Sequence, residues 1–322
     1  MHVGILSKSR NTIEYLRDEL ADHQCTVIRD RAQLETVIGR LDVLVTSSMG
    51  FHLHYIDKEI LRRAGTLKLI QQFGVASDVV DVACAARLGI PVANIPGLNT
   101  VAVAELGIYL MFALAKRAPL ARRVLAEGRV GEPVCSELAG KTLGIVGLGR
   151  IGTAVALRAR GLGMRVIAVT GEPVPGAAKA LGIDWVREPD ELPVLLAESD
   201  YVMLALPLTP RTEGLIGEKE LGRMKKGAYL INISRGPLVD REALTAALES
   251  GKLGGFAADA LWEEPADPGD PLLARPDVVV TPHIGATTEE VLRATAVAVR
   301  ENIERLMLGE KPRYIVNRLN SV

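Results

Sequence analysis

Three polar residues in the second half of the chain stand where predicted β-strands end. Arg235 follows the apolar run AYLINI, Glu264 lies five residues past the end of GGFAAD, and His283 follows DVVVT. Ligands of open α/β sheets bind outside the carboxyl ends of the strands. We therefore expect these three side chains to face one crevice.

Together these side chains suit the reduction of a 2-oxo acid or the reverse oxidation of a 2-hydroxy acid. An arginine offers a planar, permanently charged fork for a carboxylate. A histidine acts as an acid in one direction and as a base in the other. A glutamate beside the imidazole orients it and favours its charged form.

Each residue taken alone also has a simpler interpretation. Arg235 could cap a strand end or pair on the surface, Glu264 could be a solvated loop acid, and His283 could be held by backbone groups. The joint spacing of the three favours catalysis over these separate structural roles.

A glycine-rich turn provides the other half of such a reaction. Residues 147–152 read GLGRIG, directly after the predicted strand 142–146 and at the start of a predicted helix. The glycines permit a tight turn, close approach of a pyrophosphate, and close packing of helix on strand. The helix N-terminus then attracts the phosphates. In this context the motif predicts a dinucleotide site at Gly147, Gly149, Arg150, Ile151 and Gly152.

The residue after the next strand of this region bears on the choice between NAD and NADP. An acid there binds the ribose hydroxyls, whereas basic residues accept a 2′-phosphate. The predicted strand 165–169 is followed by Thr170, Gly171 and Glu172, with no Arg or Lys beside them. Glu172 could reach the ribose or be a solvated loop acid. We expect NAD as the cofactor, with NADP possible.

The elements that carry these residues alternate between strands and helices, which predicts an α/β fold with two doubly wound parallel sheets. The first series of strands is HVGIL, CTVI, LDVLV, LKLIQQF and IPVA. The second is TLGIVG, RVIAV, YVMLAL, AYLINI, GGFAAD and DVVVT, after one long apolar helix from Val101 to Leu125. We expect a substrate-binding domain of residues 1–97 and 287–322, and a dinucleotide-binding domain of residues 98–286.

The composition is that of an ordinary globular enzyme. The chain has 322 residues, of which 48% are hydrophobic and 24% charged, and its net charge is -1. We therefore expect two domains and neither a nucleic acid nor a membrane as partner. Cys25, Cys84 and Cys135 form no Cys-x-x-Cys pair and are expected to be buried thiols, with no metal, in a cytoplasmic protein.

Over nearly its whole length the chain resembles the D-isomer-specific 2-hydroxyacid dehydrogenase family. The resemblance rests on GKTLGIVGLGRIG, LALPLTPRTEGLIGEKELGRMKKGAYLINISRGPLVD, DALWEEP and TPHIGATTEE. It implies two Rossmann-like domains with the active site in the cleft between them, and a homodimer. It also implies that Arg235, Glu264 and His283 are catalytic. The implied reaction transfers a hydride between a nicotinamide cofactor and a small D-2-hydroxy acid or 2-oxo acid.

The resemblance implies further site residues. The turn after LKLIQQF matches a loop whose backbone N–H groups hold the substrate carboxylate, so the substrate-binding residues are Val75, Ala76, Ser77 and Arg235. Asp259 matches an aspartate near the nicotinamide carboxamide. The remaining cofactor-binding positions are Thr170, Pro207 and Thr212.

Two departures from the family pattern leave the substrate open. Ala76 and Ser77 stand where a Gly and a bulkier residue are common. The Thr170-Gly171 pair resembles glyoxylate/hydroxypyruvate reductases, which tend to carry Arg at the position of Glu172. His52 and His54 follow another strand end and could border the substrate or lie on the surface.

Two other functions compete with this one. A phosphite dehydrogenase shares the family and its three catalytic residues, whereas a formate dehydrogenase fits less well because it carries Gln where Glu264 stands. A dinucleotide-sensing transcriptional corepressor uses the same fold without needing turnover. Reduction of glyoxylate with a reduced nicotinamide would separate an enzyme from a sensor.

Overall fold

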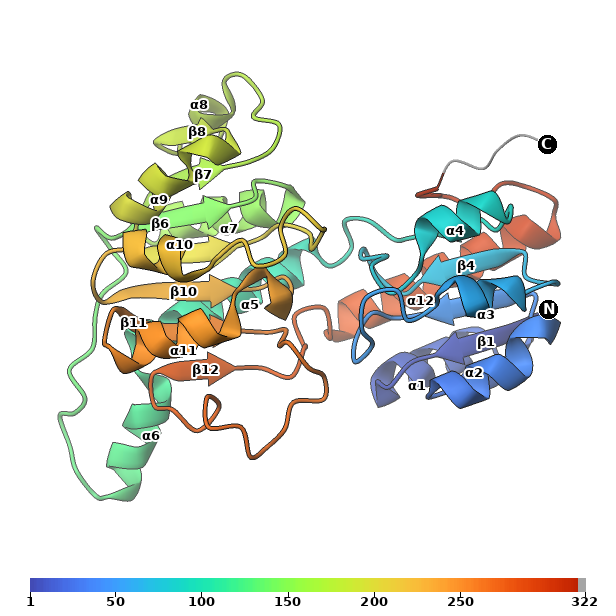
Figure 1. Ribbon diagram of the computed structural model, residues 1–322, viewed down its shortest axis with the longest axis horizontal. Coiled ribbons are helices and arrows are strands. Elements are labelled where there is room, and N and C mark those ends of the chain that lie inside the picture. The colour runs from blue at the N-terminus through green and yellow to red at the C-terminus, as the bar shows by residue number, and fades with distance from the viewer. Residues whose placement is uncertain (318–322) are drawn as a thin grey trace. The chain divides into compact units, whose positions relative to one another are not determined.

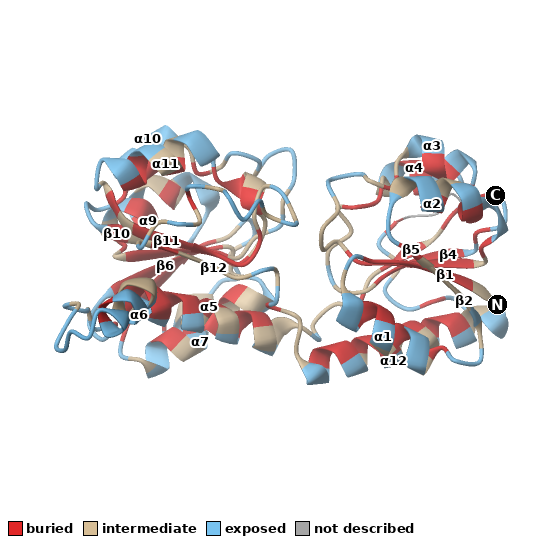
Figure 2. Ribbon diagram, turned by 90° about the horizontal axis from the view of Figure 1, so that it is seen from below, coloured by how far each residue is buried: buried red, intermediate tan, exposed pale blue. Residues whose placement is uncertain are grey.

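Two parallel β-sheets, each with helices on both faces, make up residues 1–317, the part of the chain that this computed structural model describes (Figures 1 and 2). Unit 1 contains Met1–Asn99 and the chain from Ala286 on, and unit 2 contains Thr100–Gly285. The predicted α/β class with two doubly wound parallel sheets is confirmed.

Unit 1 has a five-stranded sheet in the order β2-β1-β3-β4-β5. Helices α1 and α12 cover one face, and α2, α3 and α4 cover the other (Figure 2). The strands are almost continuous apolar runs because both of their faces are buried. The bounds are β1 His2–Leu6, α1 Arg10–Glu19, β2 Gln24–Ile28, α2 Arg31–Val37, a 3₁₀ turn at Ile38–Arg40, β3 Val43–Thr46, α3 Lys58–Arg62, β4 Leu69–Gln72, α4 Val82–Arg87, β5 Val92–Ala93 and α12 Glu289–Met307.

Unit 2 has a seven-stranded sheet in the order β12-β11-β10-β9-β6-β7-β8. The bounds are α5 Thr100–Ala115, α6 Ala118–Ala126, β6 Thr142–Val146, α7 Arg150–Gly161, β7 Arg165–Val169, α8 Ala177–Leu181, β8 Trp185–Arg187, α9 Leu192–Glu198, β9 Tyr201–Leu204, α10 Glu218–Arg223, β10 Ala228–Asn232, α11 Arg241–Glu249, β11 Leu253–Ala258 and β12 Val278–Val280, with 3₁₀ turns at Pro189–Glu191 and Gly236–Leu238. Helices α5 and α7 lie on one face, and α9, α10 and α11 on the other (Figure 2).

Helix ends follow local side chains. Ser9 accepts a hydrogen bond from the Thr12 backbone at the start of α1, and Thr288 accepts one from the Val291 backbone at the start of α12. Such caps satisfy backbone donors that the helix leaves unpaired. Helix α12 packs against α1 and the sheet of unit 1, so residues far apart in sequence share one core.

The structure corrects several sequence expectations. The long helix expected from Val101 to Leu125 is two helices, because Arg117 adopts a left-handed conformation with φ 51° and Pro119, in the first turn of α6, has no N–H to continue the hydrogen bonding of α5. Helix α2 and strand β8 were not expected at all. Of the three cysteines expected to be buried, Cys84 is buried, Cys25 is half-buried and Cys135 is exposed.

Within residues 1–317 no helix is long and apolar enough to cross a membrane. The same residues contain no cluster of three or more His, Cys, Asp or Glu side chains arranged to hold a metal ion.

Candidate active site

The three predicted catalytic residues all belong to unit 2 and follow three adjacent strands. In the order β12-β11-β10, the sheet brings the carboxyl ends of these strands together on one edge. Arg235 lies in the loop after β10, Glu264 in the loop after β11, and His283 in the loop after β12. The sheet topology therefore brings the three loops to a common edge.

Glu264 and His283 are in direct contact. The Nδ1 atom of His283 lies 3.0 Å from Oε1 and 2.9 Å from Oε2 of Glu264. Both side chains are largely buried, with exposed fractions of 18% for His283 and 21% for Glu264. The backbone N–H of Leu261 also donates to the Glu264 carboxylate at 3.3 Å. Since Glu264 occupies Nδ1, the Nε2 atom is the one left for proton transfer.

Buried Asn232 organises the loop that carries Arg235. Its side-chain amide donates to the Arg235 carbonyl at 2.7 Å, and its side-chain oxygen accepts from the Ser234 N–H at 3.0 Å. A methyl group added at Gly236 would collide with the backbone of Leu261. The loop of Arg235 therefore packs against the loop that leads to Glu264, in a close approach that only glycine permits.

Asp259 is buried at the end of β11 and has contacts that the sequence did not reveal. Its carboxylate accepts the backbone N–H groups of Ile284 and Gly285, each at 2.8 Å. Its backbone carbonyl accepts the N–H of His283, also at 2.8 Å. Asp259 therefore holds the turn that carries His283, whatever it also does for a cofactor.

The glycine-rich turn 147–152 connects β6 to α7 and fits a dinucleotide phosphate. Gly147 has φ 100°, and a methyl group on it would lie 2.5 Å from the carbonyl oxygen of Ala205. A methyl group on Gly152 would collide with the Gly147 carbonyl, whereas one on Gly149 would meet no atom within 4 Å. Helix α7 has no side-chain cap at its N-terminus. Open space at Gly149 and uncapped N–H groups, beginning at Arg150 and Ile151, are what a bound pyrophosphate requires.

An arginine that was not predicted from the sequence, Arg187, lies on β8 beside the end of β7. The Thr170 N–H donates to the carbonyl of Arg187 at 3.0 Å, because β8 pairs with β7. The Arg187 guanidinium forms an ion pair with Glu191 at 3.0 Å and lies over the Trp185 ring. Glu172 is exposed. An arginine therefore adjoins Thr170 in the fold, although none adjoins it in sequence.

The other predicted cofactor positions form a tight loop after β9. The Thr212 hydroxyl donates to the Pro207 carbonyl at 2.8 Å and accepts from the Thr209 N–H at 2.8 Å. Thr212 thus fixes the shape of the loop that begins at Pro207.

The predicted substrate loop lies in unit 1, directly after β4. The Val75 carbonyl accepts a hydrogen bond from the Asn94 side chain at 2.8 Å, and Ala76 and Ser77 are partly exposed. His52 and His54, in the loop after β3, are both exposed, and the Nδ1 atom of His52 lies 2.9 Å from the Leu53 carbonyl. These contacts help to hold the shape of the two loops, whose residues are partly or fully exposed.

Comparison with known proteins decides the family. Residues 108–285 match the family model described as "D-isomer specific 2-hydroxyacid dehydrogenase, NAD binding domain". This chain belongs to that family. It is an oxidoreductase with an NAD-binding domain, and it acts on small 2-hydroxy or 2-oxo acids by hydride transfer.

Several dehydrogenases of the family are similar over most of this chain. Glyoxylate reductase from Thermococcus litoralis is 41% identical over 89% of this chain and 87% of its own length. D-3-phosphoglycerate dehydrogenase from Methanocaldococcus jannaschii is 38% identical over 94% of this chain, which spans only 57% of that relative. The structure of D-lactate dehydrogenase from Aquifex aeolicus, with NAD and lactic acid, matches with a TM-score of 0.84, 25% identity and 96% of each chain covered.

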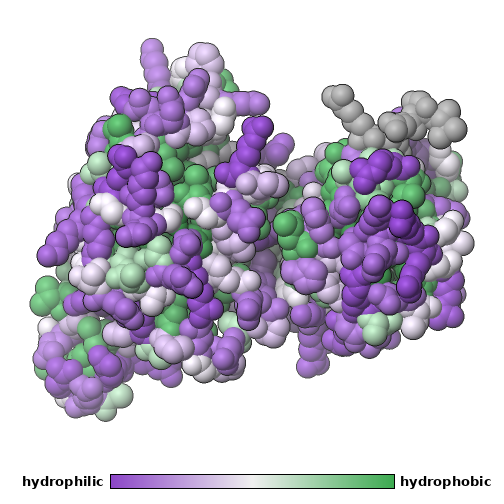
Figure 3. Space-filling view, in the orientation of Figure 1, coloured by the Kyte–Doolittle hydropathy of each residue, from purple (hydrophilic) through white to green (hydrophobic). Residues whose placement is uncertain are grey.

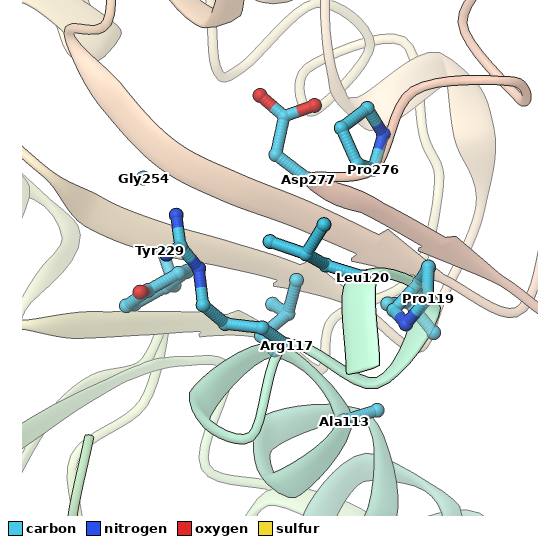
Figure 4. A pocket seen from close by; sticks show the side chains of 10 residues that line it. Ala113, Arg117, Pro119, Leu120, Tyr229, Gly254, Pro276 and Asp277 are labelled. Carbon is cyan, nitrogen blue, oxygen red and sulfur yellow. The ribbon is translucent and has the colours of Figure 1, made fainter. Parts of the chain in front are cut away.

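A pocket elsewhere in unit 2 of this dehydrogenase lies away from the catalytic edge. Figure 4 shows Arg117 and Tyr229 on one side of it and Pro119 on the other, with Leu120 between them. Tyr229 is near the start of β10, and Asp277, which also lines the pocket, directly precedes β12. The pocket is therefore at the amino-terminal edge of the sheet, opposite the edge that carries Arg235, Glu264 and His283.

Proposed function

We propose that this dehydrogenase reduces glyoxylate, hydroxypyruvate or a similarly small 2-oxo acid to the D-2-hydroxy acid, with Arg235, Glu264 and His283 as its catalytic residues. The observation that carries the proposal is the direct contact of Glu264 with His283 in a loop that packs beside that of Arg235. The similarity to glyoxylate reductases supports the choice of substrate.

In this proposal each side chain has one task. Arg235 binds the substrate carboxylate through its guanidinium fork. His283 donates the proton on Nε2 to the carbonyl oxygen, and Glu264 stabilises the imidazolium before the transfer and orients the ring through Nδ1. NAD(H), when bound, supplies the hydride that reaches the carbonyl carbon. One hydride and one proton together convert the 2-oxo acid to the 2-hydroxy acid, and the reverse direction uses His283 as the base.

We propose that unit 2, residues 98–286 in the sequence-based division, holds the cofactor on the turn 147–152. NAD(H) is the preferred cofactor in this proposal, with weak discrimination against NADP(H). Thr170 does not repel a 2′-phosphate, while exposed Glu172 places a negative charge two residues away. The substrate-binding domain of that division, residues 1–97 and 287–322, supplies the substrate loop at Val75, Ala76 and Ser77.

We also propose a homodimer formed through the corner of unit 2 that contains α6. Large apolar side chains are exposed there, with exposed fractions of 76% for Leu125, 92% for Val130 and 85% for Val134. Hydrophobic atoms are visible at this corner in Figure 3. Exposed apolar groups that gather on one face are typical of an interface. The cytoplasm is our predicted compartment because the three cysteines are free thiols.

A substrate screen tests the proposal. Glyoxylate, hydroxypyruvate, pyruvate, 3-phosphohydroxypyruvate and phosphite are each assayed with both cofactors by the absorbance of the reduced nicotinamide. We expect glyoxylate or hydroxypyruvate with NADH to give the highest kcat/KM. If phosphite is the one compound turned over, phosphite is the substrate and the proposed 2-oxo acids are not. Binding of NADH without turnover of any compound would indicate a sensor.

A variant then tests the catalytic assignment. General acid catalysis contributes roughly 10²- to 10⁴-fold, so His283→Ala should lower kcat by about that factor. Binding of NADH, followed by its fluorescence, should stay close to that of the unaltered enzyme. An active His283→Ala enzyme would show that another group donates the proton.

A further inference from the structure

His283 occupies a backbone conformation that its residue type disfavours. Its φ is 55°, in the left-handed region where residues other than glycine are uncommon. Such a conformation is unfavourable for an L-residue and persists only where the surroundings impose it. The contacts of the turn 281–285 must therefore supply the constraint.

Asp259 and Thr281 supply it. Oδ1 of Asp259 accepts the Thr281 hydroxyl at 2.6 Å and the Ile284 N–H at 2.8 Å, and Oδ2 accepts the Gly285 N–H at 2.8 Å. The His283 N–H lies 2.8 Å from the Asp259 carbonyl and 2.9 Å from the Thr281 carbonyl. Asp259 is only 6% exposed, so these donors take the place of water around its carboxylate.

The Thr281 hydroxyl is the side-chain member of this set. Thr281 itself is anchored at the end of β12, where its N–H donates to the Ala258 carbonyl at 2.9 Å. Its hydroxyl fixes the rotation of the Asp259 carboxylate, and that carboxylate fixes the two N–H groups that follow His283. These contacts connect the end of β12 to the turn that carries the imidazole.

We propose that Thr281 is a positioning residue for the reaction: through Asp259 its hydroxyl holds His283 in the left-handed conformation that keeps Nδ1 on Glu264. This inference rests on the proposed function, in which His283 transfers the proton. Without the hydroxyl, Asp259 rotates, the turn 283–285 relaxes, and the imidazole leaves the Glu264 carboxylate. A displacement of about 1 Å at a reacting group can cost roughly a hundredfold in rate.

The test compares Thr281→Val, which keeps the shape and removes the hydroxyl, with Thr281→Ser, which keeps the hydroxyl. Thr245→Val is the matched control, because the Thr245 hydroxyl also makes a hydrogen bond, at 2.8 Å to the Arg241 carbonyl, but on α11. Gly285→Ala tests the same carboxylate independently, since its methyl group would lie 2.8 Å from Oδ2 of Asp259. Glu264→Gln is the reference for a lost Glu264 charge.

The readouts are kcat, the KM of each substrate, and the pH profile of kcat/KM for the reduction. We expect Thr281→Val and Gly285→Ala to lower kcat roughly 10- to 100-fold. The reduction needs protonated His283, so its rate falls as the pH rises. Because a carboxylate at Nδ1 stabilises the protonated ring, Thr281→Val should move this falling limb to lower pH, as Glu264→Gln does. Thr281→Ser should restore both kcat and the limb, and Thr245→Val should change neither.

Three outcomes would overturn the positioning role. If the limb moves in Glu264→Gln but stays in place in Thr281→Val, the relay stands and Thr281 has no part in it. If Thr281→Ser is as impaired as Thr281→Val, the hydroxyl is not the determinant. If the limb moves in neither variant, the proposed relay between Glu264 and His283 fails together with the role of Thr281.

Discussion

Only a few side chains at the end of β7 bear on the choice between NAD and NADP. Thr170 is neutral, Glu172 is an exposed acid, and the Arg187 guanidinium is held by Glu191 and Trp185. A free cation would be needed to favour a 2′-phosphate strongly. Arg187 is engaged elsewhere, so the charge at Glu172 should decide the residual preference.

Replacing Glu172 with Arg should raise the ratio of kcat/KM for NADPH over NADH. The new cation would face the 2′-phosphate at a solvent-exposed position, where an ion pair contributes up to about 1 kcal/mol, or roughly fivefold. The ratio is measured with one substrate at fixed ionic strength. Glu249→Arg, an equal charge change on α11, serves as the control. An unchanged ratio would place Glu172 away from the ribose.

Residue types and strand ends sufficed to predict that His283 and Glu264 lie at one edge of the sheet, because parallel strands share one edge for their carboxyl ends. The sequence has no comparable signal for the hydrogen bond between Thr281 and Asp259. A threonine in a loop has many short-range partners, and its choice depends on the rotation of one buried carboxylate. Arg187 was missed because β8, which carries it beside Thr170, was not expected.

At the scale of elements, the turn between β6 and α7 contains one glycine that is needed for binding, Gly149, and one that is needed for folding, Gly152. The Cβ of an alanine at position 149 would meet no atom within 4 Å, and Gly149 has an ordinary φ of -77°. A Cβ at position 152 would collide with the Gly147 carbonyl. The two glycines therefore respond differently to the same substitution.

Gly149→Ala should fold normally and bind NADH weakly, because its methyl group fills the space that the pyrophosphate needs. Overpacking by one methyl group costs about 1–3 kcal/mol, or roughly a 5- to 150-fold rise in Kd. Gly152→Ala should lower the free energy of unfolding of unit 2 by a similar amount. Thermal unfolding and NADH fluorescence titration measure the two effects. If Gly149→Ala binds NADH as tightly as the unaltered enzyme, the pyrophosphate does not bind at this turn.

Asp200 joins the amino-terminal ends of several strands of the same sheet and makes their stability depend on pH. Burial acts to raise its pKa, but the Thr142 N–H at 2.8 Å and the Lys225 ammonium at 2.9 Å outweigh burial and leave the pKa below its usual value. A carboxyl whose pKa is lowered by folding stabilises the protein above its unfolded-state pKa. That contribution disappears as the pH falls through the folded-state pKa.

Asp200→Asn should therefore lower the free energy of unfolding of unit 2 by about 1–2 kcal/mol at neutral pH, the contribution of charge-assisted hydrogen bonds. The difference from the unaltered chain should shrink once the pH falls below about 4. Denaturant unfolding at several pH values gives both numbers. Asp184→Asn, which removes an exposed ion pair with Arg165, should have little effect at any pH. A deficit that persists unchanged in acid would mean that the charge of Asp200 is not involved.

Most of the strands were predictable because burial on both faces leaves long apolar runs, as in β6 and β9. Strand β8 is an edge strand of three residues with none fully buried, so its sequence WVR carries no such pattern. The break between α5 and α6 had a signal in the sequence, because Pro119 lies inside the range expected as one helix and a proline interrupts helical hydrogen bonding. The left-handed conformation of Arg117 had none, since an arginine does not encode that conformation.

At the scale of the whole molecule, one chain contains two sheets that use the same construction and carry different loops. In unit 1 the loops after β3 and β4 carry the histidines and the predicted substrate turn. In unit 2 the loops after β10, β11 and β12 carry the ionisable residues, and the turn after β6 carries the glycines. The α/β alternation and the glycine motif were enough to predict this class of fold, because each depends on local sequence.

The proposed dimer makes a prediction about the whole molecule. Val130 and Val134 are almost fully exposed and lie in the segment between α6 and β6. Leaving these apolar side chains in water is unfavourable, and a second surface that covered them would remove that cost. Burying a valine side chain contributes about 1.5 kcal/mol or more, and a twofold interface uses each residue twice. The double variant Val130→Glu, Val134→Glu should therefore be monomeric at micromolar concentration in sedimentation equilibrium, where we expect the unaltered chain to be a dimer. Leu53→Glu, an exposed apolar residue of unit 1, is the matched control and should stay dimeric. If the double variant sediments as a dimer, this corner is not the interface, and an unaltered chain that sediments as a monomer would refute the dimer itself.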